Sequence, residues 1–248
     1  MNQILTVVTA IFLLVIGLST GTSEPRIISA SDVEAKIRAG EPAEFDNCII
    51  VGDLNLSGLI IATPVHFNHT IFQDSLNFKS ATFSAAAYFG FSVFNGTAYF
   101  WYVNFNHTAQ FVASIFNDNA YFTDSIFNNG TYFAGSIFKG NANFRESEFN
   151  GYADFVSSDF NGHADFRYSA FNSIANFRSS TFNRTADFVS SDFNSAACFS
   201  HGEFNNSTFF GYSTFNCIAD FKESEFNGYV HFESSIFNGI AVFEESNF

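Results

Sequence analysis

Phenylalanine returns along this chain at a spacing that alternates between five and six residues, from Phe67 to the last residue, Phe248. The sequence holds 38 Phe, and the only ones that stand off this spacing are Phe12, Phe45, Phe91 and Phe209. An α-helix with 3.6 residues per turn would place successive rings on drifting faces, so no apolar stripe would form. The spacing therefore excludes a helical fold for this stretch.

Between the Phe residues the sequence follows a unit of eleven residues, with a small side chain two places before most of the Phe. This side chain is usually Ala before one Phe and Ser before the next, as in Ala164 and Ser169. Alternation along a strand would send Ala164 and Phe166 to one face, and Asp165 and Arg167 to the other. We therefore expect strands of three or four residues with the Phe rings inside.

The longer of the two spacings carries one extra residue, which is often Gly after Asn, as in Asn150-Gly151 and Asn161-Gly162. Both residue types tolerate unusual backbone angles, so we expect them to form corners between strands. Short strands joined by regular corners cannot bury a face alone, but they can when the chain winds into a solenoid whose coils pair as parallel strands.

The order of a small residue, a polar residue, a large apolar residue and two variable ones resembles the pentapeptide-repeat family. Here the form is centred on Phe, and every second repeat is stretched by one residue over about residues 45–248. The resemblance implies an all-β fold, a right-handed quadrilateral β-helix with four faces per coil. Two faces of five residues and two of six give about 22 residues per coil, so the stretch from Phe67 to Phe248 makes about eight turns.

Residues 1–23 are predicted to be an export signal, because Ile4 to Leu18 is a mostly apolar run followed by the small residues Ser19, Gly21 and Ser23. Such a run is short for a membrane span and suits a cleaved signal peptide. No Lys or Arg precedes it. An uncleaved N-terminal membrane anchor is the alternative, and both hypotheses place the body outside the cytoplasm.

Residues 24–44 are predicted to be a linker with a capping helix over residues 31–40. Ser31 and Glu34 form a capping box, Val33 and Ile37 share one face, and Gly40 ends the helix. A solenoid end exposes apolar core and unpaired strand edges, so a lid is expected there. Residues 45–248 form the solenoid, which begins with early repeats in which aliphatic residues replace most of the Phe; their core positions are Phe45, Ile50, Leu54 and Leu56.

The composition excludes several classes of function. A net charge of −14 disfavours nucleic acid and anionic lipid as partners. The residues show no nucleophile elbow, phosphate-binding Gly loop or zinc spacing, and a solid rod offers no cleft for a catalytic site. The sequence therefore predicts no enzyme, no cofactor and no metal site. Cys48, Cys198 and Cys217 show no disulfide framework.

The repeat of one coil over the next predicts columns of outward side chains. Tyr99 and Tyr121 fall in one column, and Tyr88 and Tyr132 in another with Gln110 between them. The candidate interaction patch consists of Tyr88, Tyr99, Trp101, Tyr102, Tyr121 and Tyr132. Aromatic rings on a polar surface are common at recognition sites, although contacts between Tyr residues of neighbouring coils could serve stability alone.

Two functions from different classes follow. The first is an exported structural or interaction scaffold at the cell surface, with an unidentified macromolecular partner. The second comes from the resemblance, because the pentapeptide-repeat proteins of quinolone resistance are acidic rods that resemble B-DNA and bind DNA gyrase. Phe248 ends the chain on a core position, so a homodimer through an uncapped C-terminal end is a further expectation, and a truncated sequence is its alternative.

Overall fold

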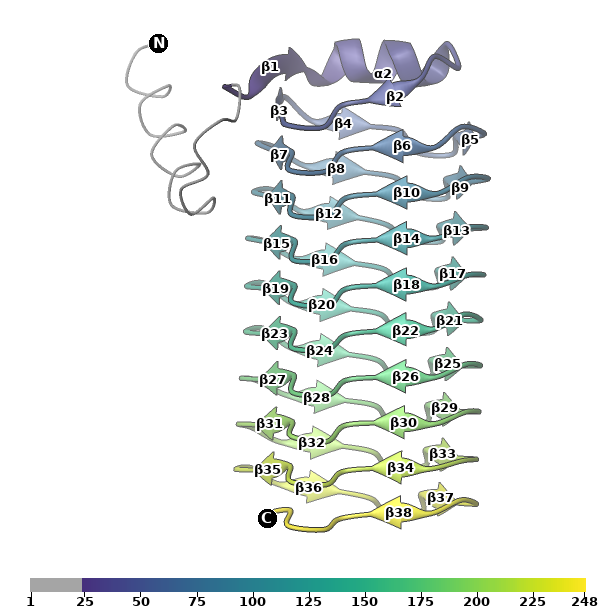
Figure 1. The fold of residues 1–248 in the computed structure, drawn as a ribbon, viewed down its shortest axis with the longest axis vertical. Coiled ribbons are helices and arrows are strands. Elements are labelled where there is room, and N and C mark those ends of the chain that lie inside the picture. Colours follow the sequence, from purple (N-terminus) through teal and green to yellow (C-terminus); the bar gives the residue numbers. More distant parts are fainter. Residues whose placement is uncertain (1–23) are drawn as a thin grey trace.

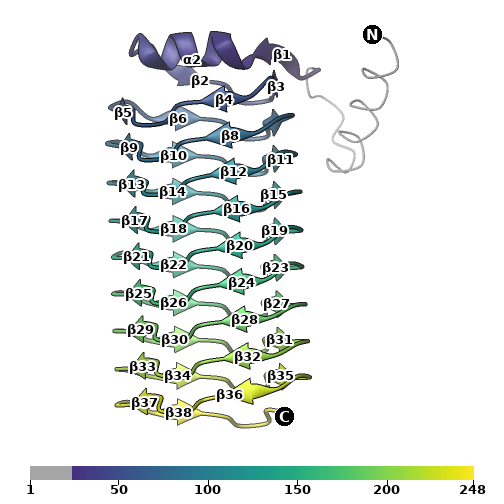
Figure 2. The same ribbon diagram turned by 180° about the vertical axis from the view of Figure 1, so that it is seen from behind.

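The computed structural model describes residues 24–248 as a rod of four parallel β-sheets capped by one helix, α2 (Ala30–Arg38) (Figure 1). The four sheets are labelled A to D, with their strands given below, and each coil contributes one strand to each sheet in the order A, C, D, B. Sheet B faces the viewer in Figure 1, and Figure 2 brings sheet C to the front. Sheets A and D form the two sides, so B and C are opposite faces. The winding is right-handed (Figure 1).

Most strands are two residues long, shorter than the three or four predicted. Sheet A contains β1 (Arg26–Ser29), β3 (Cys48–Val51), β7 (Ile71–Phe72), β11 (Val93–Phe94), β15 (Ile115–Phe116), β19 (Ile137–Phe138), β23 (Asp159–Phe160), β27 (Thr181–Phe182), β31 (Glu203–Phe204) and β35 (Glu225–Phe226). Sheet B contains β2 (Ala43–Glu44), β6 (Val65–His66), β10 (Ala87–Tyr88), β14 (Ala109–Gln110), β18 (Thr131–Tyr132), β22 (Ala153–Asp154), β26 (Ala175–Asn176), β30 (Ala197–Cys198), β34 (Ala219–Asp220) and β38 (Ala241–Val242).

Sheet C contains β4 (Leu54–Asn55), β8 (Leu76–Asn77), β12 (Ala98–Tyr99), β16 (Ala120–Tyr121), β20 (Ala142–Asn143), β24 (Ala164–Asp165), β28 (Ala186–Asp187), β32 (Thr208–Phe209) and β36 (Val230–His231). Sheet D contains β5 (Ile60–Ile61), β9 (Thr82–Phe83), β13 (Asn104–Phe105), β17 (Ile126–Phe127), β21 (Glu148–Phe149), β25 (Ala170–Phe171), β29 (Asp192–Phe193), β33 (Thr214–Phe215) and β37 (Ile236–Phe237).

The register between coils has the predicted length of one coil: Tyr99 pairs with Tyr121, and Tyr88 with Gln110. Earlier strands above Phe67 extend the eight predicted turns to about ten coils, because two of the sheets hold ten strands each. The all-β solenoid predicted from the spacing of Phe is therefore confirmed.

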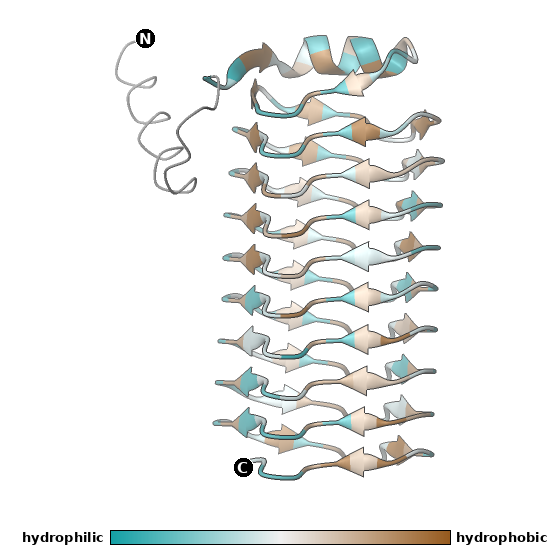
Figure 3. Cartoon of the chain, in the orientation of Figure 1, coloured by the Kyte–Doolittle hydropathy of each residue, from teal (hydrophilic) through white to brown (hydrophobic). Residues whose placement is uncertain are grey.

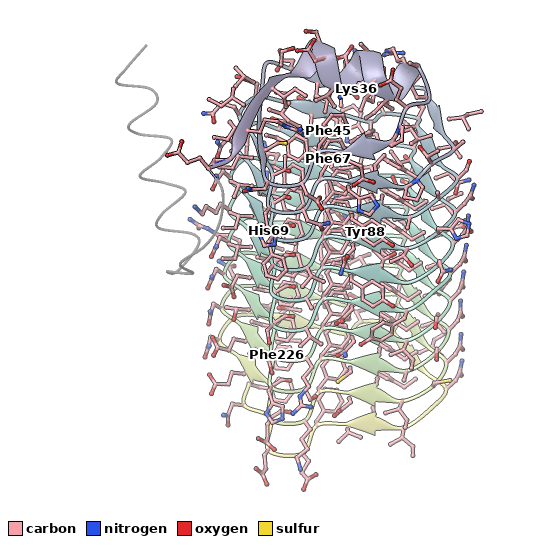
Figure 4. All side chains as sticks on the ribbon, turned by 45° about the horizontal axis from the view of Figure 1, so that its top comes forward. Lys36, Phe45, Phe67, His69, Tyr88 and Phe226 are labelled. Atoms are coloured by element: carbon pink, nitrogen blue, oxygen red, sulfur yellow. The ribbon has the colours of Figure 1, made fainter. Side chains whose placement is uncertain are left out.

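The interior of the rod is filled by Phe rings. Phe166 is fully buried and stacks between Phe144 and Phe188 with ring centroids 4.9 Å away on each side. It also meets Phe155 and Phe177 edge to face at 5.5 and 5.3 Å. Both geometries are favourable for aromatic pairs. The labelled Phe45 and Phe67 stack in the same way beneath the cap (Figure 4).

The alternation of Ser and Ala has a hydrogen-bonding cause. The Ser residues that precede Phe in sheets A and D are mostly buried, and their hydroxyls donate to Phe carbonyls of the coil above. The Ser147 hydroxyl donates to the Phe122 carbonyl at 2.6 Å, and the Ser169 hydroxyl donates to the Phe144 carbonyl at 2.7 Å. The equivalent positions of sheets B and C mostly hold Ala, and where they hold Thr, as at Thr131 and Thr208, the hydroxyl reaches only the carbonyl two residues earlier, at 3.4 and 3.3 Å.

The corners differ from the sequence prediction. The glycines of the Asn-Gly pairs are not in the left-handed region. These positions require a residue without a side chain, because a Cβ on Gly151 or Gly162 would collide with the backbone of the coil above. The left-handed residues lie instead at the five-residue corners, two places after each Phe of sheets B and C. Most of them are not Gly, and they include Tyr102, with φ 57°, and Tyr168, with φ 59°.

The Asn residues that follow Phe form amide ladders along the six-residue corners. The longest begins at Asn106, and each Asn Nδ2 donates to the Asn Oδ1 of the coil above, as in Asn172 to Asn150 at 2.7 Å. The ladder reaches Asn238, which donates to Asn216 at 2.8 Å. Such ladders of stacked amides satisfy polar groups between coils.

The cap is present but begins earlier than predicted. Ser29, and not Ser31, caps α2, because its hydroxyl accepts a hydrogen bond from the Asp32 amide at 3.1 Å. Val33 and Ile37 are buried against the first coils, as expected. A strand that was not predicted, β1, pairs with β3 in register and adds to sheet A within the predicted linker.

The outer surface changes character along the rod. In sheet A the outward column is aliphatic in β7, β11, β15 and β19, and from β23 it consists mainly of acidic residues (Figure 3). The change occurs between Ile137 and Asp159, which are paired residues of adjacent coils.

Candidate interaction surface

The six predicted patch residues are divided between two opposite faces of the rod. Tyr88 and Tyr132 lie on sheet B, and Tyr99 and Tyr121 on sheet C, while Trp101 and Tyr102 follow β12. The columns predicted from the register are confirmed, but a single ligand contact could not cover both faces. The two groups are therefore separate candidates.

The sheet C group is a compact aromatic cluster. Tyr99 and Tyr121 stack at 5.7 Å with ring planes 8° apart. Trp101 meets both rings edge to face, at 5.5 Å from Tyr99 and 5.3 Å from Tyr121. The Lys79 ammonium lies over the Trp101 ring at 5.7 Å, a cation–π contact. All three rings are half-buried, so the cluster is firmly packed and still reaches the surface.

Trp101 carries a polar group that the fold does not satisfy. Its indole Nε1 is buried and has no hydrogen-bond partner among the described residues. An unpaired buried donor costs free energy, which the ring contacts of Trp101 with Tyr99 and Tyr121 counteract.

The sheet B group is looser. Tyr88 stacks on His66 at 4.8 Å, and Gln110 separates it from Tyr132. Tyr132 has only a tilted contact with Tyr152 at 6.1 Å. Because a polar residue separates the two rings, they form a weaker candidate than the sheet C cluster.

Tyr102 occupies the corner between sheets C and D, where 55% of its surface is exposed. Two further tyrosines, Tyr168 and Tyr212, lie in the same column and are equally exposed, at 52% and 60%. Neither was predicted as a site residue, although each lies a whole number of coils after Tyr102: three coils for Tyr168 and five for Tyr212. The cluster on sheet C is thus continuous at Tyr102 with an aromatic corner.

Comparison with known families supports the architecture. A family model described as pentapeptide repeats, in nine copies, matches residues 111–159. No curated protein matches the chain. The matched segment lies inside the uninterrupted register of four parallel sheets. The chain is a pentapeptide-repeat protein.

Below the aromatic cluster, the sheet C face of this pentapeptide-repeat protein carries ion pairs. Arg167 donates to Asp165 through two nitrogens, at 2.9 and 2.7 Å, and lies 3.5 Å from Asp187. The hydrogen bonds to Asp165 are the main cause that raises the pKa of Arg167 above its ordinary range. Burial raises the pKa of Asp187, even though Arg167 counteracts it. These contacts neutralise the charges that the register places side by side.

Pentapeptide-repeat solenoids are generally non-enzymatic, and the filled interior agrees with that description. Within residues 24–248, no group of three His, Cys, Asp or Glu side chains is arranged to hold a metal ion. The three cysteines are free thiols. The predicted signal at residues 1–23 lies outside the described residues, and among those described no helix is long and apolar enough to cross a membrane.

Proposed function

We propose that this protein is an exported, non-enzymatic rod that serves as a structural or interaction scaffold at the cell surface or envelope. The observation that carries the interaction role is the sheet C cluster of Tyr99, Trp101 and Tyr121, whose three rings pack against one another and are only partly buried. Rigid aromatic anchors are enriched at binding hot spots because they lose little entropy on binding.

Export is supported by the apolar run from Ile4 to Leu18 and the small residues after it. The test is fractionation of the source cells with mass measurement of the protein's N-terminus. A mature chain that starts near residue 24 outside the cytosol supports a cleaved signal, and an intact chain in the membrane fraction supports an anchor. An intact N-terminus in the cytosol overturns export.

The interaction role is tested by affinity capture with the mature protein and a Tyr99→Ala, Tyr121→Ala variant. Partners that depend on the cluster are retained by the natural protein and lost by the variant. Tyr88→Ala serves as the matched control, because it removes an outward tyrosine from the opposite face. Equal capture by all three proteins overturns the assignment of the cluster.

The acidic surface favours a second candidate, a DNA mimic that binds a DNA-processing protein such as DNA gyrase. Its support is the net charge of −14 and the acidic residues that replace aliphatic ones along sheet A from Asp159 onward. A gyrase supercoiling assay with the purified rod tests it. Inhibition at micromolar concentration supports the mimic, and an unaffected reaction excludes it.

Association through the last coil completes the proposal. Ile236, Ile240 and Phe248 are each more than half exposed there, and exposed apolar side chains favour contact with a second copy. Sedimentation equilibrium tests this association: a dimer that Phe248→Asp dissociates supports it. A strict monomer at micromolar concentration rules it out.

A further inference from the structure

The corner between sheets C and D carries a straight row of residues, one from each coil, two places after the Phe of sheet C. Backbone hydrogen bonds hold these corners one above the other: the Tyr102 amide N–H donates to the Thr123 carbonyl of the next coil, and the Tyr168 amide N–H donates to the Val189 carbonyl. The part of the row from Tyr102 onward, which we name the tyrosine ridge, contains Tyr102, Asp124, Glu146, Tyr168, Ser190, Tyr212 and Ser234. Coils repeat at about 4.8 Å, so Tyr102 and Tyr168 are about 14 Å apart, and Tyr168 and Tyr212 about 10 Å.

The fold does not require tyrosine at these positions. All three have φ between 57° and 59°, a left-handed conformation that is unfavourable for bulky residues. Elsewhere in the same row the corner is formed by Ser190 and Ser234, which have no large ring. Since more than half of each tyrosine is exposed, burial does not account for the choice. The rings are available to a partner instead.

The charges beside the ridge indicate what kind of partner. Asp124 lies in the row, and the sheet D strands next to it present Glu148 and Asp192. No cation lies within ion-pair distance of these three carboxylates among residues 24–248. The neighbouring cations are already neutralised: Arg145 pairs with Glu146 at 2.9 Å, and Arg167 with Asp165 at 2.7 Å.

The molecule also shows how the ridge would hold a cation. The Arg145 guanidinium lies 5.2 Å from the centre of the Tyr168 ring, a cation–π contact formed within the rod. No cation lies over Tyr102 or Tyr212 in the described part of the chain. Both rings are therefore open to a guanidinium or ammonium group supplied from outside.

We propose that the tyrosine ridge is a docking surface for an extended basic segment of a partner protein. Cations of the segment lie on the Tyr102 and Tyr212 rings, since Arg145 already lies over Tyr168, and the carboxylates of Asp124, Glu148 and Asp192 supply the complementary charge. An extended chain rises about 3.4 Å per residue and its side chains alternate between two faces, so the span of about 24 Å from Tyr102 to Tyr212 is matched best by two cations about eight residues apart on the same face. The inference rests on the proposed interaction role and names the chemistry of the partner.

The probe is a fluorescein-labelled, otherwise Gly/Ser peptide with Arg at its first and ninth positions, which lie on the same face of an extended chain. Binding is measured by fluorescence anisotropy at low salt with the full chain. The variant Tyr102→Ser, Tyr168→Ser, Tyr212→Ser leaves the net charge unchanged, and Ser already forms this corner in other coils. We expect its dissociation constant to rise about tenfold or more. The matched control, Tyr229→Ser, removes a tyrosine that is 63% exposed on another corner and should change binding by less than about twofold.

Several outcomes overturn the inference. Equal binding by the natural protein and the triple variant shows that net charge alone attracts the peptide. Equal binding of a peptide with Gln in place of Arg shows that the ridge does not recognise a basic segment. Competition by a neutral oligosaccharide such as cellohexaose shows that the ridge binds a glycan instead. Far-UV circular dichroism and a thermal melt must show that the triple variant is folded. If it is unfolded, the single variants Tyr102→Phe and Tyr102→Asn replace it. We then expect the Phe variant to retain binding of the peptide and the Asn variant to bind it more weakly. Retained binding by the Asn variant overturns the inference.

Failure here is distinguishable from failure of the proposed function. A cytosolic protein whose ridge still binds the peptide refutes export and leaves the docking surface in place. An exported protein that captures partners through Tyr99 and Tyr121 but ignores the peptide refutes the ridge alone.

Discussion

The alternation of Ser and Ala along the rod can be tested by exchanging the two residue types within one coil. In Ser169→Ala, the Phe144 carbonyl loses the hydroxyl that donates to it at 2.7 Å and keeps only the longer turn bond from the Ser147 amide at 3.2 Å. The lost bond is buried, since Ser169 is 1% exposed. A buried hydrogen bond contributes about 0.5–1.5 kcal/mol net, and a partly unsatisfied acceptor adds to the loss. We expect a destabilisation of about 1–2 kcal/mol.

The opposite exchange, Ala164→Ser, places a hydroxyl at a position where hydroxyls of other coils find only a distant acceptor. Thr208 lies two coils further along the same column and Thr131 at the equivalent position of sheet B, and their hydroxyls reach only the carbonyl two residues earlier, at 3.3 and 3.4 Å. Burying a hydroxyl without a good partner costs about 1–3 kcal/mol in proteins. Both exchanges should therefore destabilise, although each merely installs the residue found before the neighbouring Phe.

The assay is denaturation by guanidinium chloride, followed by circular dichroism, with the slope and midpoint compared between variants. Solenoids can lose cooperativity, so the comparison is valid only where the slope is unchanged. Ser179→Ala is the control, because Ser179 is exposed at a corner and its hydroxyl makes no hydrogen bond to a Phe carbonyl. If Ala164→Ser leaves the midpoint in place, or Ser169→Ala raises it, hydrogen bonding is not the cause of the alternation.

Three more predictions follow from the core, the corners and the carboxylates. Phe166→Ala removes a ring stacked on both sides and should cost about 3–5 kcal/mol, whereas Arg167→Ala at the surface should cost far less; equal midpoints would refute the assignment of inside and outside. Tyr212→Gly relieves a left-handed φ of 58°, so its free energy of unfolding should stay within about 1 kcal/mol of the natural protein, and a large loss would show that the ring is structural. Burial raises the pKa of Asp154, Asp159 and Asp187, so the native state binds protons more tightly than the unfolded chain; the midpoint of unfolding should rise as pH falls from about 7 toward the ordinary carboxyl range near 4, and Asp159→Asn should reduce that slope.

The periodic part of the fold was predictable from sequence because each coil repeats the same local problem. The spacing of Phe alone predicted that Phe166 points inward, that Tyr99 pairs with Tyr121 and how many residues make one coil. This was possible because parallel strands in register repeat the same side-chain orientation in every coil. The corners were harder. Asn-Gly suggested unusual φ angles, yet the glycines serve close approach of backbones, and that constraint comes from the neighbouring coil.

The cap and the surface sites were less predictable for a related reason. Ser31 and Ser29 both suit a helix start, and the choice of Ser29 depends on β1, which has no Phe to mark it. Tyr102 was identified beside Trp101, but Tyr168 and Tyr212 were not, because residues of other types separate them from Tyr102 in the row and only the structure shows that their rings are exposed at one corner. Columns of one residue type are visible in the sequence, whereas a row of mixed residues becomes a surface only when the coils are stacked.

The division between a fixed interior and a variable exterior explains how such a rod can acquire function. Every coil presents outward positions whose side chains contribute little to the Phe stack, so Ile137 can give way to Asp159 one coil later without a change of register. A Ser corner can likewise become Tyr at a cost confined to that corner, as at Tyr212 after Ser190. Binding sites on this fold are therefore expected as rows along the axis or clusters across two adjacent columns, and both the sheet C cluster and the tyrosine ridge have that form. Substitutions that affect recognition should then leave unfolding nearly unchanged, while substitutions two residues away in the core should do the opposite.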